Sequence, residues 1–202
     1  MDYISNIFLI FAVIDPIGSI PVYLEATKNF DAIEKRKIAI RASAIAFGIL
    51  LFFIVIGQII LEWMSVSLDA FQISGGVILF LFALTMIFGE GKPEREKAHI
   101  SDYRQVTIFP IAIPSIASPG AIMAVVLMTD NHIYTLDQQI VTTAEVLAVV
   151  ILTALMLLFA NTLQKRIGNY GIMVISKVMG LILASYAVQS ILSGVTNYIE
   201  NL

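Results

Sequence analysis

The stretch IDPIGSIP, residues 14–21, places an aspartate, a glycine and two prolines inside an apolar run long enough to cross a membrane. Proline has no backbone N–H and clashes with the carbonyl four residues earlier, so it breaks a helix. The prolines at 16 and 21 are therefore expected to leave carbonyls of residues 12–17 without helical partners. At membrane depth such backbone is tolerated only where it is buried in protein or lines an aqueous cavity.

The chain as a whole has the composition of an integral membrane protein. Of its 202 residues, 58% are hydrophobic and 13% are charged, whereas soluble domains average about 45–50% and about 25%. No polar stretch is long enough to fold alone, so we expect one all-α transmembrane domain over residues 1–202. The absence of cysteine excludes a disulfide framework and a thiolate metal site, and no metal site is expected.

The number of membrane spans follows from the apolar runs. A hydrocarbon layer about 30 Å thick needs roughly 20 mostly apolar residues per helix. Six stretches qualify, and the first and fourth of them are interrupted by proline and glycine. We place the spans at residues 4–27, 38–61, 70–88, 106–129, 141–163 and 172–194.

The basic residues predict the orientation. All 12 Lys and Arg lie in or beside the connections that follow the first, third and fifth spans, and such residues collect on the cytoplasmic side. Both termini are then expected outside, in a multi-pass protein of the cytoplasmic (inner) membrane. We interpret the basic loops as solvated and topology-setting rather than as binding sites for lipid or nucleic acid.

The two interrupted spans indicate an internal repeat. IDPIGSIP in the first span has a counterpart in IASPGAIM, residues 116–123, in the fourth. The third and sixth spans are also alike, with Gly76 near Gly180. A repeat of three spans starts its second copy on the opposite side of the membrane, which is the inverted plan of many secondary transporters. Repeat one would cover about 1–90, a cytoplasmic loop about 91–105, and repeat two about 106–202.

Two breaks related in this way would bring the starts of two half-helices together near the midplane. Their positive dipole ends and free N–H groups can hold an anion such as a carboxylate. The expected substrate- or ion-binding residues at the breaks are Asp15, Pro16, Gly18, Ser19, Ser115, Ser118, Pro119 and Gly120. The serines either donate to substrate or satisfy carbonyls of their own helices. Small residues that allow close helix packing are Gly75, Gly76 and Gly180.

Asp15 is the only acidic residue expected deep in a span, because Glu25, Glu62 and Glu145 lie nearer the ends. A carboxylate there is costly and therefore points to function. It would accept a substrate ammonium group, coordinate a cation or carry a coupled proton. The alternative is that Asp15 only caps the half-helix that begins at Pro16.

Four ordered motifs carry a resemblance to a known family: DPIGSIP at 15–21, ISGGVILFLFALTMI at 73–87, IAIPSIASPGAI at 111–122 and VMGLILASYAVQSILSGV at 178–195. Over nearly its whole length the sequence resembles the MarC family of six-span membrane proteins, also classed as the neutral amino-acid transporter family. The sequence departs from the family pattern at two positions: Ser19 stands where the family usually has Asn, and Ser118 where it often has Gly. Both departures bear on the identity of the substrate. The resemblance implies import or export of small neutral amino acids such as glycine or alanine, driven by a cation or proton gradient.

Other functions remain open at this stage. An exporter of drugs or other metabolites fits the same motifs, and a non-transporting scaffold fits the hydrophobicity but leaves the paired breaks unexplained. An intramembrane protease would need two membrane carboxylates or a membrane histidine, and both histidines lie in loops. We expect no enzyme activity, no cofactor and no nucleic-acid partner. A coupling H⁺ or Na⁺ and a homo-oligomer are left open.

Overall fold

The computed structural model describes residues 3–88 and 102–200, and every regular element in those two ranges is helical. The elements in chain order are α1 (Tyr3–Ile14), α2 (Ser19–Ala26), α3 (Ala32–Trp63), α4 (Leu68–Phe88), α5 (Tyr103–Val106), the irregular segment η1 (Thr107–Ile116), α6 (Pro119–Leu127), α7 (Leu136–Leu158) and α8 (Ala160–Glu200). This confirms the all-α fold class. The expected cytoplasmic loop at about 91–105 lies mostly outside the described residues.

The count of spans agrees with six. Five stretches are long and apolar enough to cross a membrane, and a sixth is the pair Tyr103–Ile116 and Pro119–Leu127, which is bent by 55°. The first span, Ile4–Ala26, contains the gap between α1 and α2. Both interruptions therefore fall in the first and fourth spans, where the prolines predict them.

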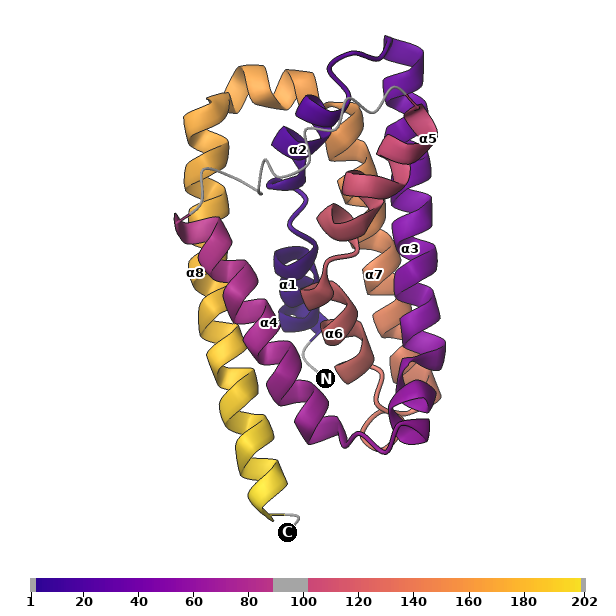
Figure 1. Ribbon diagram of the computed structural model, residues 1–202, viewed down its shortest axis with the longest axis vertical. Coiled ribbons are helices and arrows are strands. Elements are labelled where there is room, and N and C mark those ends of the chain that lie inside the picture. The colour runs from indigo at the N-terminus through magenta and orange to yellow at the C-terminus, as the bar shows by residue number, and fades with distance from the viewer. Residues whose placement is uncertain (1–2, 89–101, 201–202) are drawn as a thin grey trace.

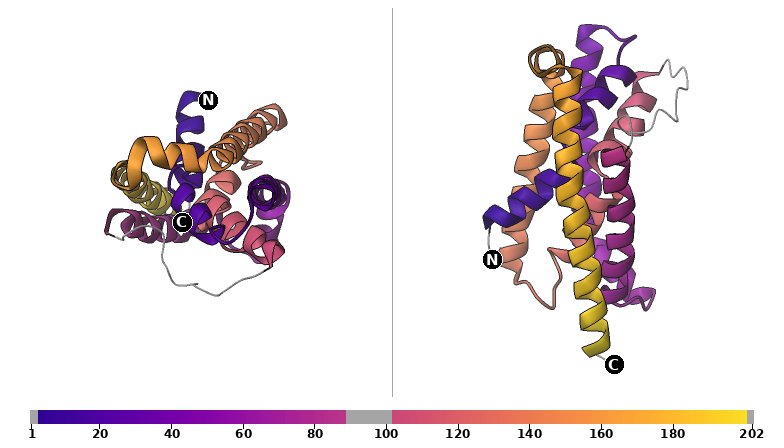
Figure 2. Two further views of the ribbon diagram at one scale, coloured as in Figure 1. Left: turned by 90° about the horizontal axis from the view of Figure 1, so that it is seen from above. Right: turned by 90° about the vertical axis from the view of Figure 1, so that its left-hand side faces the viewer.

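The connection between the fifth and sixth spans is a helix rather than a loop. Within α8 the backbone turns at Gly168, whose φ of 73° and ψ of 162° lie in a region that side chains disfavour. Residues 160–167 cross one end of the bundle, and the part after Gly168 runs along its length (Figures 1 and 2). The expected sixth span at 172–194 lies in this second part.

The long helices α3, α4, α7 and α8 surround the broken spans, which lie centrally (Figure 1). In that view α3 runs downward and α7 upward, and α4 runs upward and α8 downward. α3 packs against α7, α4 against α8, and α1 and α2 against α6 and η1. The second and fifth spans therefore contact each other and run in opposite directions, as do the third and sixth.

Packing between the long helices uses the small residues. A Cβ on Gly76 of α4 would come 2.7 Å from Ile191 Cγ1, and a Cβ on Gly180 of α8 would come 2.9 Å from Met86 Cβ. A Cβ on Gly75 would overlap the Met123 side chain of α6. These glycines thus lie where α4 meets α8 and α6.

The outer surface is as apolar as the interior. Phe52 is 47% exposed, Leu81 57% and Leu192 58%, which would be costly in water over such an area. A hydrocarbon surrounding removes that cost. Helices suit this setting because every backbone group is satisfied within its own segment.

Candidate functional site

The break in the first span is organised by Asp15. This residue follows α1, is 2% exposed and has a φ of 49°, a left-handed conformation that Asp tolerates better than most residues. Its Oδ1 accepts the Gly18 N–H at 2.9 Å, and its carbonyl accepts the Ser19 N–H at 3.1 Å. Asp15 therefore closes a turn over residues 16–18 that leads into α2, which begins at Ser19.

Gly18 has no room for a side chain. A Cβ at this position would overlap the Asp15 carboxylate. The position of the Asp15 carboxylate therefore requires glycine at residue 18, because the carboxylate occupies the space that the side chain of any other residue would need.

The break in the fourth span repeats this arrangement with a hydroxyl. Ser118 has extended backbone, with φ −72° and ψ 157°, and its Oγ accepts the Ala121 N–H at 3.0 Å. Pro119 is the first residue of α6 and Gly120 the second. Leu79 of α4 covers Gly120, since a Cβ there would come 2.5 Å from Leu79 Cδ1. In both breaks a side-chain oxygen accepts the N–H three residues later and a proline directly follows the residue that supplies this oxygen, but only Pro119 is the first residue of a helix.

Hydrogen bonds join the two breaks directly. The Ser118 hydroxyl donates to the Val13 carbonyl at 2.9 Å, and the Ser115 hydroxyl donates to Ser19 Oγ at 3.0 Å. Ser19 Oγ lies 3.0 Å from the Asp15 carbonyl and 3.3 Å from the Ser115 carbonyl, either of which can accept its proton. All four of these polar side chains are at most 2% exposed. The structure thus brings the predicted polar residues of both breaks into one buried cluster.

These bonds correct one expectation in part. Of the carbonyls of residues 12–17, those of Val13, Asp15 and Ile17 have partners, which are the Ser118 hydroxyl, the Ser19 N–H and the Ile20 N–H. A serine from the other break replaces one missing N–H, and local turns supply the other two.

Backbone donors at both breaks stay open. Within residues 3–88 and 102–200, the N–H groups of Ile17, Ser118 and Gly120 have no acceptor. Ile17 and Gly120 are each the second residue after the side chain that accepts at their break, so these two N–H groups lie at equivalent points. Unsatisfied N–H groups in the first turn of a helix are suited to binding an anion.

Glu145 is buried, contrary to the expectation that it lies near the end of its span. It is 7% exposed, and its Oε2 has no hydrogen-bond partner in the described part of the chain. Thr142, one turn earlier on α7, has an unpartnered hydroxyl as well, and α7 packs against α1. The expectation was wrong because α7 begins at Leu136 and not at 141. A capping box between Thr135 and Gln138 marks that start in the sequence.

Asp130 is a third buried carboxylate, and the sequence places it in a loop. It is 4% exposed, and its Oδ1 accepts the Gln58 amide at 2.7 Å and the His132 N–H at 2.8 Å. The Asn131 N–H donates to Gln58 Oε1 at 2.9 Å. Asp130 thus fixes the chain after α6 to α3, and its hydrogen bonds are made, unlike those of Glu145. No local pattern relates these residues to Gln58.

A metal centre has no basis in the described residues, since no group of three or more His, Cys, Asp or Glu side chains gathers there. The chemistry at the breaks is that of hydrogen-bond donors, hydroxyls and one carboxylate. Such a set can bind a small polar molecule.

Comparison with known proteins assigns the family. The family model described as MarC family integral membrane protein matches residues 1–199. The chain is 34% identical over 189 residues to a UPF0056 membrane protein of Methanocaldococcus jannaschii, covering 92% of each chain. It is 31% identical over 205 residues to the UPF0056 membrane protein YvbG of Bacillus subtilis, covering 96% of this chain and 94% of that one. No solved structure matched. With its six candidate spans and a family match over nearly its full length, this multi-pass protein belongs to the MarC family of integral membrane proteins.

Proposed function

We propose that the protein is a secondary transporter that moves small neutral amino acids across the cytoplasmic membrane by alternating access, with both termini outside. The observation that carries the proposal is the pair of capped half-helix starts that meet in one buried cluster, residues 13–19 and 115–121. Discontinuous helices whose N-terminal ends face a central site are a recurring way for transporters to bind substrate.

The charges at the breaks favour a zwitterion. Asp15 is the only charged residue in residues 12–24 and 107–127 together. A substrate ammonium group would pair with the Asp15 carboxylate, and a substrate carboxylate would accept from the open N–H groups of Ile17 and Gly120. Nothing else charged is available, so a substrate side chain would need to be small and uncharged.

The hydrogen bonds between the breaks describe a closed arrangement. Ser115 and Ser118 link the fourth span to Ser19 and Val13 of the first. For a substrate to enter, at least one of these links must open. The proposed motion is a movement of one three-span half against the other. It is supported by the packing of corresponding elements against one another, α3 on α7 and α4 on α8.

We assign the coupling ion, H⁺ or Na⁺, to Glu145. An ionised carboxylate oxygen that is buried without a donor is costly, and Glu145 Oε2 is such an atom, so Glu145 would be more stable with a bound proton or cation. Its neighbour Thr142 offers a further oxygen. α7 packs on α1, which ends at Ile14, the residue before Asp15, so a proton or cation bound at Glu145 would alter the surroundings of the helix that leads into the break. No cofactor is needed.

The test of substrate binding is counterflow of labelled glycine or alanine in liposomes that contain the purified protein. Asp15→Asn keeps an oxygen for the Gly18 N–H but removes the charge, and it is expected to lower counterflow about tenfold or more, because a buried ion pair is lost. Asp137→Asn, which removes an exposed acid from the first turn of α7, is the control and should transport normally. Normal counterflow in Asp15→Asn would leave Asp15 as a cap alone. No transport of any neutral amino acid by the folded protein would favour the scaffold.

The test of coupling uses Glu145→Gln. Exchange of labelled for unlabelled substrate should persist, while uptake driven by an imposed pH or Na⁺ gradient should be lost. Glu62→Gln, at the exposed end of α3, is the matched control. Gradient-driven uptake that is unchanged in Glu145→Gln would remove Glu145 from coupling without affecting the assignment of the substrate site.

A further inference from the structure

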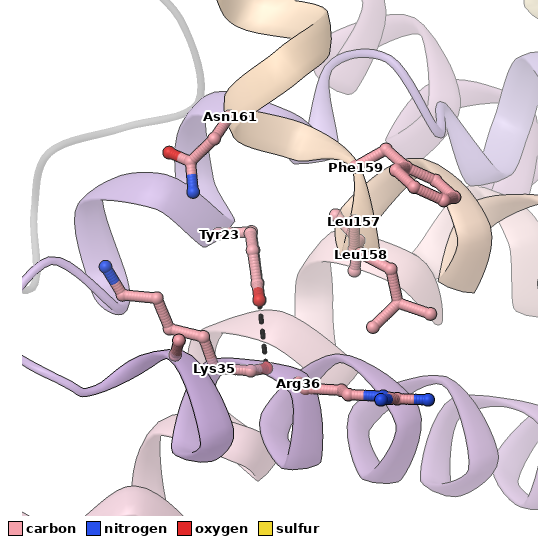
Figure 3. Close-up of a pocket in the computed structure, with 8 residues that line it drawn as sticks. Tyr23, Lys35, Arg36, Leu157, Leu158, Phe159 and Asn161 are labelled. Carbon is pink, nitrogen blue, oxygen red and sulfur yellow. Dashed lines mark hydrogen bonds between the residues drawn. The ribbon is translucent and has the colours of Figure 1, made fainter.

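A pocket of about 540 Å³ lies at the end of the bundle where α2, the start of α3 and the junction of α7 with α8 meet (Figure 3). Two of its lining residues, Lys35 and Arg36, are basic, and none is acidic. The Tyr23 hydroxyl donates to the Lys35 carbonyl at 2.9 Å, which fixes α2 to α3 at the centre of the pocket. In Figure 3 the side chains of Lys35 and Arg36 extend to opposite sides of this bond.

The two cations are uncompensated. Neither Lys35 nor Arg36 has an ion-pair partner in the portion of the chain that the structure describes. Other basic residues at this end do have partners: Lys28 pairs with Glu25 at 2.6 Å, and Arg41 donates to the Tyr103 hydroxyl at 3.0 Å. The pocket therefore presents positive charge that no group within residues 3–88 and 102–200 neutralises.

The opposite wall is apolar. Leu157, Leu158 and Phe159 line it, and Phe159 is 60% exposed. Beside them, Asn161 turns its amide nitrogen toward Tyr23 (Figure 3). One pocket thus combines cationic and amide donors with an exposed hydrocarbon surface.

The pocket lies at the basic end of the bundle. Residues 160–167 cross the bundle end at the same level (Figures 1 and 2) and carry exposed Lys165 and Arg166. Basic residues mark the cytoplasmic side, where anionic headgroups meet the first methylene groups of the acyl chains.

We propose that this pocket binds an anionic phospholipid. The lipid phosphate lies on the Lys35 side of the pocket with the Asn161 amide as a further donor, Arg36 adds positive charge on the other side, and the acyl chain begins along Leu158 and Phe159. Cationic and amide donors select the phosphate, and the apolar wall selects a lipid over a free anion. This site is separate from the breaks and does not rest on the transport proposal.

The experiment measures thermal unfolding of the protein purified in an uncharged detergent while phosphatidylglycerol is added. The lipid should raise the melting temperature in a saturable way. Lys35→Ala with Arg36→Ala should weaken the apparent affinity for phosphatidylglycerol about thirtyfold. The two cations are expected to contribute about equally to the free energy of binding an anionic headgroup. Lys165→Ala with Arg166→Ala removes the same two charges next to the pocket without touching its lining, and should bind as the wild type does.

Three outcomes would overturn the proposal. Inorganic phosphate that raises the melting temperature as much as phosphatidylglycerol would indicate a free-anion site. Phosphatidylcholine with the same acyl chains acting equally would show that charge is not selected. An equal loss in the Lys165→Ala and Arg166→Ala pair would indicate diffuse surface attraction. If the alanine pair fails to fold, Lys35→Gln with Arg36→Gln replaces it, and the comparison of lipids in the wild type stands without either variant.

Discussion

The breaks in the first and fourth spans use the same cap but different atoms. At the first, the Asp15 carboxylate accepts the Gly18 N–H from a left-handed backbone with φ 49°. At the second, the Ser118 hydroxyl accepts the Ala121 N–H from ordinary extended backbone and also donates to Val13. An ionised carboxylate only accepts, whereas a hydroxyl accepts and donates. The second break can therefore tie the two together, while the first carries the charge.

The largest expected effect comes from filling the space at Gly18. Gly18→Ala should lower the free energy of unfolding by about 3 kcal/mol, since the Cβ displaces the Asp15 carboxylate from the N–H it caps and overpacks the turn. Thermal unfolding in detergent measures this. Gly48→Ala is the control, because no atom lies within 4 Å of that Cβ and alanine favours a helix. If Gly18→Ala is as stable as the wild type, the hydrogen bond from the residue 18 N–H to the Asp15 carboxylate does not contribute to stability.

A smaller effect is expected at the second break. Ser118→Ala removes a cap, about 1 kcal/mol, and a hydrogen bond between membrane helices, about 0.6 kcal/mol, so the unfolding free energy should fall by about 1.5 kcal/mol. Ser185→Ala, where an exposed hydroxyl donates to the Leu181 carbonyl of its own helix, should change little. Equal losses in the two variants would show that Ser118 does not link the breaks.

The smallest effect is expected at Ser115, whose hydroxyl donates to the hydroxyl oxygen of Ser19. Ser115→Ala should cost about 0.6 kcal/mol in the same assay, because Ser19 can still donate to the Asp15 carbonyl. If Ser115→Ala is more destabilising than Ser118→Ala, the link between the breaks depends on Ser19 rather than on Val13.

Much of this architecture can be predicted from the sequence, because proline acts locally. Pro16 and Pro119 remove a backbone donor wherever the chain runs, so the breaks follow from the residues themselves. The preceding Asp15 and Ser118 are good caps for the same local reason. The six spans follow from apolar length, although the ends of the fifth and sixth shifted where polar residues continue a helix, as in α7 from Leu136.

The contacts across the molecule could not be predicted. Ser118 and Val13 are 105 residues apart, and Gln58 and Asp130 are 72 apart. The sequence around each of these residues does not indicate which distant residue will be its hydrogen-bond partner. Glu145 was misplaced because α7 begins at Leu136, and its burial depends on how α7 packs against the other helices, which apolar length alone does not report.

The bond from Ser118 to Val13 also has a consequence in time. Ribosomes add about 5–20 residues per second, so the hydroxyl that satisfies the Val13 carbonyl is synthesised roughly 5–20 s after that carbonyl. Throughout that interval the first break has entered the insertion machinery without the partner that closes it. Until the fourth span has been synthesised, water or the translocon must donate a hydrogen bond to the Val13 carbonyl in place of Ser118. The first span therefore reaches its final hydrogen bonding in the membrane only after the second half of the chain has been made.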